Sequence, residues 1–499
     1  MKIKKKIINK NMISKENNFE NLNINPDHLN PFNFDEFEDG YLLTNDFGNY
    51  SFLSPEEFKK LLTKDLKESS EKYNELWRKG FLKRDLSEYE PLKDQYRRQK
   101  ASLFSGPSLH IMVVTLRCNQ NCIYCQASAK GMDNKDLDMD IETARETVDA
   151  IFETSSDYLT IEFQGGEPLA NWEVVKFVVD YARKKEKETD KNVNFSLVSN
   201  LSLLTEERLD FLADRLVGIC TSLDGPEKVH NKNRPYADGN SYAETIKWIK
   251  RYREKREKLQ EEGRELTKIN SLVTLSRASL DYSEEIINEY VRLGFFGMHL
   301  RPLSYLGKSA GDFKDQMGYS VEEFLEFWKE SLDYIVEINK MGRDFHERET
   351  RLILRKILAN QDPGYTDLSS PCGAAIGQML YNYDGTVYTC DEGRMIGDDT
   401  FKIGEIGEDG YEEMMASDTT QAVITASLLD NQPCNNCVYK PFCGVCPVKN
   451  YSNYGSLFPQ MENTGWCKLQ KGQFSYIFSK LKDDDYKEVF ENWVEPFRD

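Results

Sequence analysis

Three cysteines stand close together in the chain, with three and then two residues between them: Cys118, Cys122 and Cys125. They follow the apolar stretch Leu109–Leu116, and Tyr124 stands just before the last of them. Three thiolates on one loop can hold three irons of a 4Fe–4S cluster and leave the fourth iron open to a small molecule. A structural zinc site is the alternative, but such a site usually takes four ligands in paired knuckles. The spacing therefore favours an iron–sulfur cluster.

Polar residues follow three further apolar stretches, Tyr158–Phe163, Val193–Ser199 and Val217–Leu223. After the first stretch come two adjacent glycines, which let a backbone approach a ligand closely, and a carboxylate that could meet an ammonium group. Alone, this Gly-Gly-Glu-Pro segment could be only a tight turn. The polar positions at these ends are Gln164, Gly165, Gly166, Glu167, Pro168, Ser199, Asn200, Ser222, Asp224 and, further along, Arg234.

Strands and helices must position these residues, and apolar stretches alternate with amphipathic ones from residue 107 to 310. The expected strands are Leu109–Leu116, Tyr158–Phe163, Val193–Ser199, Val217–Leu223, Ile269–Leu275 and Gly297–Pro302. The expected helices are Ile141–Glu153, Glu173–Lys187, Glu206–Asp214, Tyr242–Glu261 and Ser283–Leu293. Mostly apolar strands in this order predict a parallel sheet, curved into a partial (β/α)6 TIM-like barrel. Active sites on such sheets lie at the carboxyl ends of the strands, where the cysteine loop and the polar residues stand. Cys220 lies mid-strand and is expected in the core.

Seven more cysteines lie in the last third of the chain. The pair Asp384-Gly385 predicts a hairpin turn between Met379–Tyr383 and Thr386–Thr389. Cysteines at ligand spacings, without a secretion signal, indicate metal binding rather than disulfides. Two zinc knuckles could use six of the seven. The seven are Cys372, Cys390, Cys434, Cys437, Cys443, Cys446 and Cys467.

The cysteine loop, the Gly-Gly-Glu segment and the later cysteines together resemble the radical S-adenosylmethionine (SAM) enzymes that carry a SPASM domain. The resemblance covers roughly residues 107–475. It implies that the open iron of the first 4Fe–4S cluster binds SAM, which is cleaved to a 5′-deoxyadenosyl radical that abstracts hydrogen. The residues that it implies for the SAM pocket are Tyr124, Gln164, Gly165, Gly166, Glu167, Pro168, Ser199, Asn200, Ser222, Asp224 and Arg234.

For the SPASM domain, the resemblance implies two auxiliary 4Fe–4S clusters. One would be held by Cys434, Cys437, Cys443 and Cys467. The other would be held by Cys372, Cys390 and Cys446, with one iron open or bound by a non-cysteine ligand. The gap before Cys446 has two residues, one fewer than in the family pattern.

Asp391 directly follows Cys390. In the anaerobic sulfatase-maturating enzymes, which the chain resembles more distantly, the matching position is an aspartate proposed as the base that deprotonates the substrate. A carboxylate beside a cluster could take a proton while the cluster takes an electron. Alternatively, it would accept hydrogen bonds near the thiolates without taking part in catalysis. Both interpretations stay open on the sequence.

The N-terminal region differs in composition from the rest. Residues 1–33 are rich in Asn and Lys and are expected to be disordered. Residues 34–100 predict a hairpin, Gly40–Thr44 with Asn49–Leu53, followed by a helix that Ser54 caps and a second helix over about residues 66–79. This small α+β unit resembles the winged-helix-like domains that recognise leader peptides, and an ordinary N-terminal cap is the alternative. The expected remaining parts are the radical SAM barrel at 107–310, a helical bridge at 311–365, the SPASM domain at 366–475 and a helical tail at 476–499.

The net charge of −19 argues against nucleic acid and anionic membranes as partners, and no apolar run approaches the length of a membrane span. The polar start offers no signal-peptide core, so a cytoplasmic location is expected. Finer details of the sequence at Leu109–Asn119, Glu162–Leu169 and Tyr381–Gly385 resemble the His-Xaa-Ser-system type of maturase. This resemblance implies modification of a ribosomal precursor peptide whose leader binds near residues 40–53, a carbon–carbon or thioether crosslink, and an electron donor such as flavodoxin or ferredoxin. A formylglycine-making sulfatase maturase and a non-enzymatic zinc-ribbon protein are the alternatives.

Overall fold

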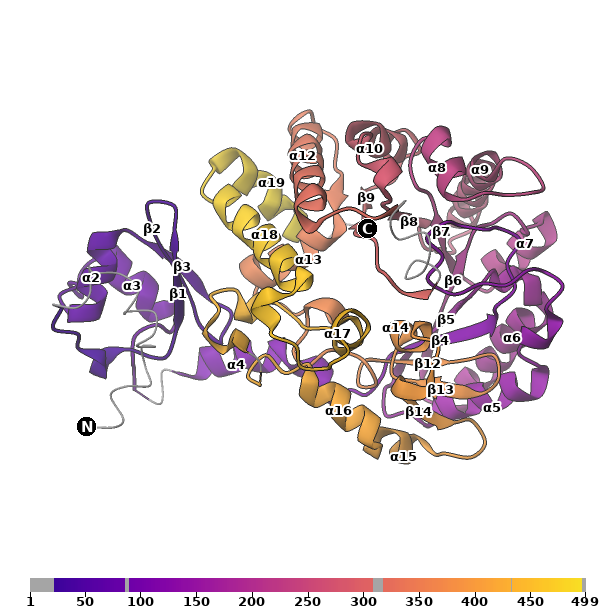
Figure 1. Ribbon diagram of the computed structural model, residues 1–499, viewed down its shortest axis with the longest axis horizontal. Helices are drawn as coiled ribbons and strands as arrows, with labels where there is room; N and C mark the ends of the chain where they lie inside the picture. Colours follow the sequence, from indigo (N-terminus) through magenta and orange to yellow (C-terminus); the bar gives the residue numbers. More distant parts are fainter. Residues whose placement is uncertain (1–21, 86–88, 308–316, 432, 496–499) are drawn as a thin grey trace.

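The computed structural model describes residues 22–85, 89–307, 317–431 and 433–495. Figure 1 shows a small N-terminal unit at one end and a helix-covered sheet at the other, with the C-terminal helices between them. Among the described residues, no helix is long and apolar enough to cross a membrane.

A parallel sheet forms the barrel part of the molecule. Its strands are β4 (Leu109–Thr115), β5 (Tyr158–Gly165), β6 (Asn192–Ser199), β7 (Val217–Ser222), β8 (Asn270–Thr274) and β10 (Leu300–Arg301), in that spatial order. Alternate residues of β5, such as Leu159, Ile161 and Phe163, are buried against the helices, while Glu162 and Gln164 face the barrel interior. The helices on the outer face are α5 (Ile141–Glu153), α6 (Trp172–Glu188), α7 (Glu206–Asp214), α9 (Ser241–Glu261) and α10 (Ser283–Arg292) (Figure 1). The predicted partial barrel is confirmed.

The sixth predicted strand departs from expectation. It is split into β9 (Gly297–Met298) and β10, and only β10 pairs with β8. β9 pairs instead with β11 (His346–Glu347), which lies in the segment after the barrel. The first three residues of β8 therefore pair on one side only, with β7, and the sheet opens beside them. A short helix, α8 (Glu227–Asn233), is present in addition to the expected helices.

The predicted SPASM hairpin is present as β12 (Gln378–Tyr381) and β13 (Thr386–Tyr388), with Gly385 at a φ of +87° in the turn. β12 pairs in parallel with β4, and β14 (Lys402–Glu405) pairs with β13, so a single nine-stranded sheet runs through both parts. Short helices follow: α14 (Asp391–Met395), α15 (Tyr411–Ala416), α16 (Asp418–Ala426) and α17 (Pro447–Tyr454). The sequence predicted the hairpin but not its addition to the barrel sheet.

Four longer helices lie between the barrel and the N-terminal unit (Figure 1). They are α12 (Val321–Lys340), α13 (Arg348–Leu358), α18 (Gly465–Lys480) and α19 (Asp484–Val494). α12 and α13 correspond to the expected bridge, of which residues 311–316 lie outside the described part of the chain. Phe324, Trp328 and Phe474 of these helices are fully buried in the core shared with the barrel.

The N-terminal unit is an antiparallel sheet of β1 (Asn33–Phe37), β2 (Gly40–Thr44) and β3 (Tyr50–Leu53), followed by α2 (Pro55–Thr63), α3 (Glu71–Arg78) and α4 (Glu90–Gln99). The predicted hairpin is confirmed, and Ser54 caps α2 in a reciprocal capping box with Glu57. The expected disorder is wrong for residues 22–33, because Leu29 is fully buried and Leu22 and Ile24 pack beside it. Residues 1–21 lie outside the described chain.

Candidate functional site

The three-cysteine loop leaves the carboxyl end of β4 and is held by backbone hydrogen bonds. The amide of Cys118 donates to the carbonyl of Lys130 (2.8 Å), and that of Ile123 donates to the carbonyl of Asn233 (3.0 Å). The sulfurs are also acceptors: Asn200 Nδ2 lies 3.7 Å from Cys118 Sγ, and Gln120 N lies 3.4 Å from it. Donors around sulfur stabilise a thiolate, which is the form that binds metal.

The raised pKa values of these thiols fit ligation of a metal cluster. Burial, with a smaller contribution from Glu167, raises the pKa of Cys118 to about 12. Burial raises the pKa of Cys122 to about 11, against the opposing effect of Arg234. At neutral pH such thiols ionise only if a nearby cation compensates, and iron ligation supplies that charge. The donor set therefore fits a thiolate-ligated cluster at this loop.

The two glycines after β5 are required by the loop itself. A Cβ atom on Gly165, whose φ is +131°, would lie 2.0 Å from the carbonyl oxygen of Thr115. One on Gly166 would lie 2.3 Å from the carbonyl oxygen of Arg117. Glu167 N donates to that same carbonyl (2.7 Å). The glycine pair thus lets β5 and the cysteine loop run in close backbone contact, which fixes the loop at the mouth of the barrel.

The carboxylate of Glu167 is fully buried and already holds three donors. Oε1 accepts from Ser199 Oγ (2.7 Å) and Leu169 N (3.1 Å), and Oε2 accepts from Asn200 N (2.8 Å). Burial raises its pKa to about 7, although these hydrogen bonds act in the opposite direction. In this structure Glu167 joins the ends of β5 and β6, while Gln164, Gly165 and Gly166 line the open cavity.

Tyr124, Asp224 and Arg234 form a buried group beneath the cysteine loop. Tyr124 Oη donates to Asp224 Oδ2 (2.5 Å), and Arg234 Nε lies 3.1 Å from the same oxygen. The Arg234 guanidinium also stands 5.3 Å from the centre of the Tyr124 ring, and Arg234 Nη1 lies 3.8 Å from Cys122 Sγ. Asp224 is fully buried, so it orients Tyr124 and Arg234, which line the cavity.

A cavity of about 540 Å³ occupies the barrel interior next to the loop. Its walls include the three loop cysteines and, from the SPASM part, Asp391 and Glu392. The other predicted residues on its walls are Tyr124, Gln164, Gly165, Gly166, Ser199, Asn200, Ser222 and Arg234. The expectation that Cys220 belongs to the core is wrong: it faces this cavity, because β7 turns Ile219 to the helices and Cys220 to the interior.

Three of the later cysteines form an inner set: Cys372, Cys390 and Cys446. All three are buried in one cluster that also contains Ile111 and Val113 of β4. Burial, and then neighbouring carboxylates and the other two thiols, raises the pKa of Cys390 well above its ordinary value. Gly393 N lies 3.3 Å from Cys390 Sγ, and Lys449 N lies 3.5 Å from Cys446 Sγ. The shortened gap before Cys446 does not keep it from this group.

The other four form an outer set: Cys434, Cys437, Cys443 and Cys467. Burial, and then the nearby thiols of Cys437 and Cys467, raise the pKa of Cys434 to about 12. Burial and the other three thiols also raise the pKa of Cys443. All four are partly exposed, in contrast to the buried inner set. The structure thus brings together the same two groups that the family pattern pairs.

Within the described part of the chain, no group of three or more His, Cys, Asp or Glu side chains is arranged to hold one metal ion. Ligands of a 4Fe–4S cluster need not converge on one point, because each thiolate binds a different iron.

Glu392 and Arg301 are charged residues of the cavity wall that were not singled out from the sequence. Glu392 follows Asp391 on α14, and burial together with Asp391 raises its pKa to about 8. Arg301, at the end of β10, faces the same cavity, and its charge lowers the pKa of Glu392. Lys449 lies nearby and pairs with Asp367 (3.0 Å). Glu392 could have been found as the second carboxylate after Cys390, whereas nothing marks Arg301 among the many arginines of the chain.

Comparison with protein families gives two matches. The model described as the Radical SAM superfamily matches residues 112–259, and the SPASM model, described as an iron-sulfur cluster-binding domain, matches residues 372–438. The first range begins in β4 and contains the three-cysteine loop, and the second contains Cys372, Cys390, Cys434 and Cys437.

Two characterised relatives match along most of the chain. The "Radical SAM cyclopropyl synthase TigE" of Paramaledivibacter caminithermalis is 23% identical over 460 residues, which are 86% of this chain and 84% of that protein. The "Cysteine-type anaerobic sulfatase-maturating enzyme" of Clostridium perfringens is 25% identical over 386 residues, 75% of this chain and 97% of that protein.

Solved structures share the fold. "Native anSMEcpe with bound AdoMet and Cp18Cys peptide" superposes with a TM-score of 0.63 at 20% identity, covering 77% of this chain and 100% of the other. Streptococcus suis SuiB bound to precursor peptide SuiA gives a TM-score of 0.52 at 12% identity, covering 89% and 99%. Both superpositions show a fold shared over most of this chain.

Proposed function

We propose that this chain, a radical SAM enzyme that also carries a SPASM domain, modifies a ribosomally made peptide by removing hydrogen from it and closing a crosslink. When bound, the iron–sulfur clusters and SAM supply the 5′-deoxyadenosyl radical that takes a hydrogen atom and accept the electron left over when the product forms. The chain's own residues hold these groups, exclude water, place the peptide and take the remaining proton.

A single observation carries the proposal: Cys118, Cys122 and Cys125 share one cavity with Asp391 and Glu392. A substrate residue in that cavity would have the site of hydrogen abstraction on one side and a carboxylate on the other. Loss of two hydrogens from the peptide needs one hydrogen-atom acceptor, one proton acceptor and one electron acceptor. Asp391 is the proposed proton acceptor, and the inner set beside it is the proposed ligand set of the nearer auxiliary cluster.

The proposed ligands of the SAM cluster are the three loop cysteines, and those of the two auxiliary clusters are the inner and outer sets. Gln164, Gly165 and Gly166 would border the methionine part of SAM, and Ser199, Asn200 and Ser222 its ribose. Glu167 and Asp224 would not contact SAM. Their hydrogen bonds would hold the end of β6 and Tyr124 of the cysteine loop in place. A flavodoxin or ferredoxin is the proposed electron donor.

Solved structures with the same fold support a peptide substrate. The structures of anSMEcpe and SuiB contain a bound peptide and a bound precursor peptide. In this chain, β3 is an edge strand of the N-terminal sheet, so a leader could add there as a further strand near residues 40–53. Lys72 Nζ now donates to the carbonyl of Phe52 (3.2 Å), a bond that a leader amide would replace.

The relatives favour a carbon–carbon bond over a thioether. TigE, which matches over most of the chain, is named a cyclopropyl synthase, and a cyclopropane is closed by a carbon–carbon bond. The second candidate function is formylglycine formation on a sulfatase, which rests on the match to the Clostridium perfringens enzyme. That match covers 75% of this chain, less than the 86% that TigE covers, and the difference favours closure of a carbon–carbon bond.

The test uses anaerobically purified protein with a short peptide encoded beside its gene. The full chain should hold about twelve irons, the number in three 4Fe–4S clusters, and should convert the peptide to a product lighter by about two mass units, as loss of two hydrogens requires. Replacing Cys118, Cys122 and Cys125 together by Ala should abolish SAM cleavage and remove only about four irons. Cys220→Ala, the matched control, should keep the iron. A product heavier by oxygen or without a new bond would reject the crosslink.

A further inference from the structure

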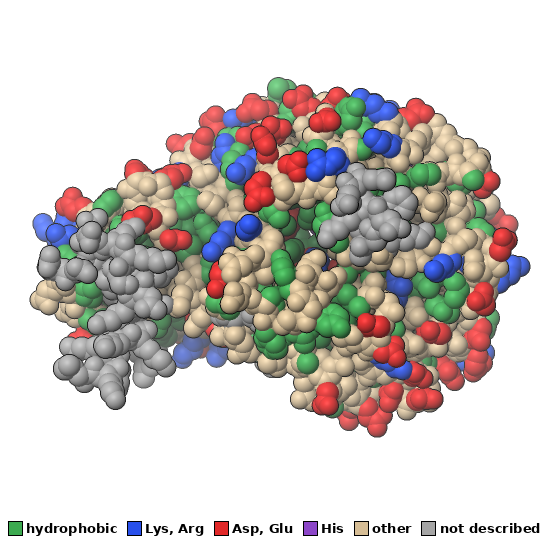
Figure 2. All heavy atoms as spheres, in the orientation of Figure 1, with side chains coloured by type: hydrophobic (Ala, Val, Ile, Leu, Met, Phe, Trp, Pro, Cys, Tyr) green, Lys and Arg blue, Asp and Glu red, His purple; other side chains and the backbone are tan. Residues whose placement is uncertain are grey.

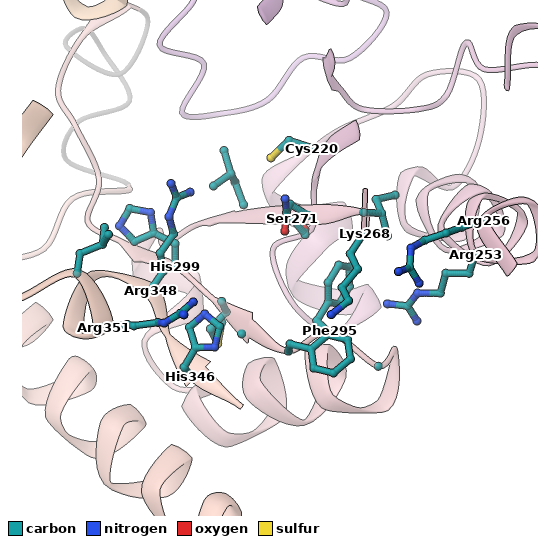
Figure 3. Close-up of a pocket in the computed structure, with 18 of the residues that line it drawn as sticks. Cys220, Arg253, Arg256, Lys268, Ser271, Phe295, His299, His346, Arg348 and Arg351 are labelled. Carbon is teal, nitrogen blue, oxygen red and sulfur yellow. The ribbon is translucent and has the colours of Figure 1, made fainter. Parts of the chain in front are cut away.

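A second cavity, of about 560 Å³, lies at the amino end of β8, beside Cys220 of β7, where the sheet opens because β9 pairs elsewhere. Figure 3 shows arginines of α9 and α13 reaching toward it from opposite sides, with Lys268 between them. Its basic residues are Arg253, Arg256, Lys268, Arg348, Arg351 and Arg355, and Glu257 is the acidic residue on its walls. Such a cluster is unusual for a chain with a net charge of −19, whose carboxylates spread over the surface seen in Figure 2.

The cations around this cavity are held by rings and carbonyls. Lys268 Nζ stands 4.2 Å from the centre of the Phe296 ring, and the Arg253 guanidinium 5.0 Å from that of Phe295. Arg256 Nε donates to the carbonyl of Leu266 (2.9 Å). Among the described residues, no carboxylate forms an ion pair with Arg253, Arg256, Lys268, Arg348 or Arg355. These positive charges are therefore in place for an anionic ligand, since opposite charges nearby favour binding.

The histidines of the cavity do not add to this charge at neutral pH. Burial lowers the pKa of His346 to about 4, and it lowers the pKa of His299 well below its ordinary value. Lysine and arginine alone supply the positive charge, so anion binding here should not change between mildly acidic and mildly basic solution.

The basic cavity adjoins the reaction cavity. Both are lined by Cys220 of β7, Leu272 of β8 and His299 between β9 and β10, and by Arg348 and Leu352 of α13. A peptide that occupied both cavities would therefore run along β8, from the carboxyl ends of the strands toward the basic residues.

We infer that the basic cavity binds an acidic stretch of the peptide substrate while the residue to be modified lies at the other end of the barrel. The inference rests on the proposed function and names a feature of its substrate. From Asn270 to Thr274 of β8 is a rise of about 13 Å, which an extended peptide spans in about four residues. The substrate should therefore carry Asp or Glu about four or five residues from its modified position.

The alternatives fit the structure less well. An acidic electron-donor protein would dock on a convex or flat surface near a cluster, whereas this site is a cavity at the end of the strands opposite the cysteine loop. A small inorganic anion would need only two or three of the six cations and would not account for the walls that this cavity shares with the reaction cavity.

The test measures binding of dye-labelled tetraglutamate and tetraglutamine peptides to the cluster-loaded full chain by fluorescence anisotropy. The tetraglutamate should bind at least about tenfold more tightly than the tetraglutamine, and the difference should shrink as salt rises from about 0.05 to 0.5 M. The variant R253Q/R256Q should lose most of this preference, and K268Q should lose part of it. Arg145→Gln is the control. It removes an exposed arginine of α5 that pairs with Glu142, and it should leave the preference for tetraglutamate unchanged.

Equal affinity for the two peptides, or an unchanged preference in both variants, would overturn the inference. So would binding of inorganic phosphate with no preference for the acidic peptide, which would make this a small-anion site. If R253Q/R256Q fails to fold, as judged by circular dichroism, K268Q alone decides, because Lys268 is only partly buried. The assay needs no turnover, so a failure of peptide modification would not affect its result.

Discussion

The inner and outer cysteine sets occupy contrasting surroundings. The inner set is buried against β4 and stands beside Asp391 and Glu392 on the wall of the reaction cavity. The outer set is partly exposed and lies beside the N-terminal unit, where Asn33 Nδ2 donates to the carbonyl of Cys437 (3.1 Å) and Thr44 Oγ1 to that of Val438 (2.6 Å). Together with the proposed function, the contrast predicts a division of roles. The inner set would serve the chemistry, while the outer set would carry electrons toward the surface and lie at the contact with the N-terminal unit.

The largest effect should follow from removing a ligand of the inner set. Cys390→Ala leaves two cysteines there, so we expect loss of about four irons and no detectable peptide modification, while SAM cleavage without modification continues. Cys467→Ala leaves three cysteines in the outer set, so most of its iron should stay and modification should only slow. Iron analysis and mass spectrometry of the peptide measure both. Equal losses of iron and of peptide modification in the two variants would contradict the proposed difference in role between the inner and outer sets.

A smaller effect should separate the two carboxylates beside the inner set. Asp391→Asn removes the proposed proton acceptor and should slow modification about 100-fold, within the usual range for general-base catalysis, without changing the iron content. Glu392→Gln is the matched variant one residue away and should have a clearly smaller effect on the single-turnover rate. The reverse order would move the proton acceptor to Glu392 and leave Asp391 as a hydrogen-bond acceptor near the thiolates.

The smallest effect concerns the anchor of the outer set. Thr44→Val leaves the buried carbonyl of Val438 without its donor and should lower the free energy of unfolding of the N-terminal unit by about 1–3 kcal/mol. Urea unfolding monitored by proteolysis can report this. Thr63→Val, which removes an exposed hydroxyl bonded to Lys59, is the control and should change it by less than about 0.5 kcal/mol. No difference between the two would mean that this hydrogen bond adds nothing measurable to the other contacts of the unit, such as the packing of Tyr50 and Phe52 against Phe478.

The sequence predicted those features whose signals are local. The barrel strands and helices follow from apolar periodicity, and α5 and α7 have the expected ends because Asp140 and Thr205 cap them. The addition of β12 to β4 joins segments more than 250 residues apart, and the pairing of β9 with β11 leaves no local mark. The basic cavity draws cations from α9, α13 and the start of β8, without a common spacing.

Composition gave a wrong prediction of disorder for a segment whose few apolar side chains are buried. Residues 22–33 look disordered from their asparagines, yet Leu29 fills a core with Phe58 and Phe81, and burial of a few such side chains offsets the entropy of ordering a short segment. The role of Glu167 was also hidden, because a ligand-facing carboxylate and one that braces two strands look alike in sequence. Only its three donors distinguish them.

The unbroken sheet from β10 to β14 limits how the enzyme can move. A hinge between barrel and SPASM parts would have to break the ladder between β12 and β4, whose four residue pairs lie in the middle of that sheet. Motion of the two parts as separate rigid bodies would therefore cost the free energy of breaking these strand pairs. We expect a substrate to enter through motions of loops or of the N-terminal unit instead. The spatial relation between the inner set and the three-cysteine loop should then stay constant through the catalytic cycle.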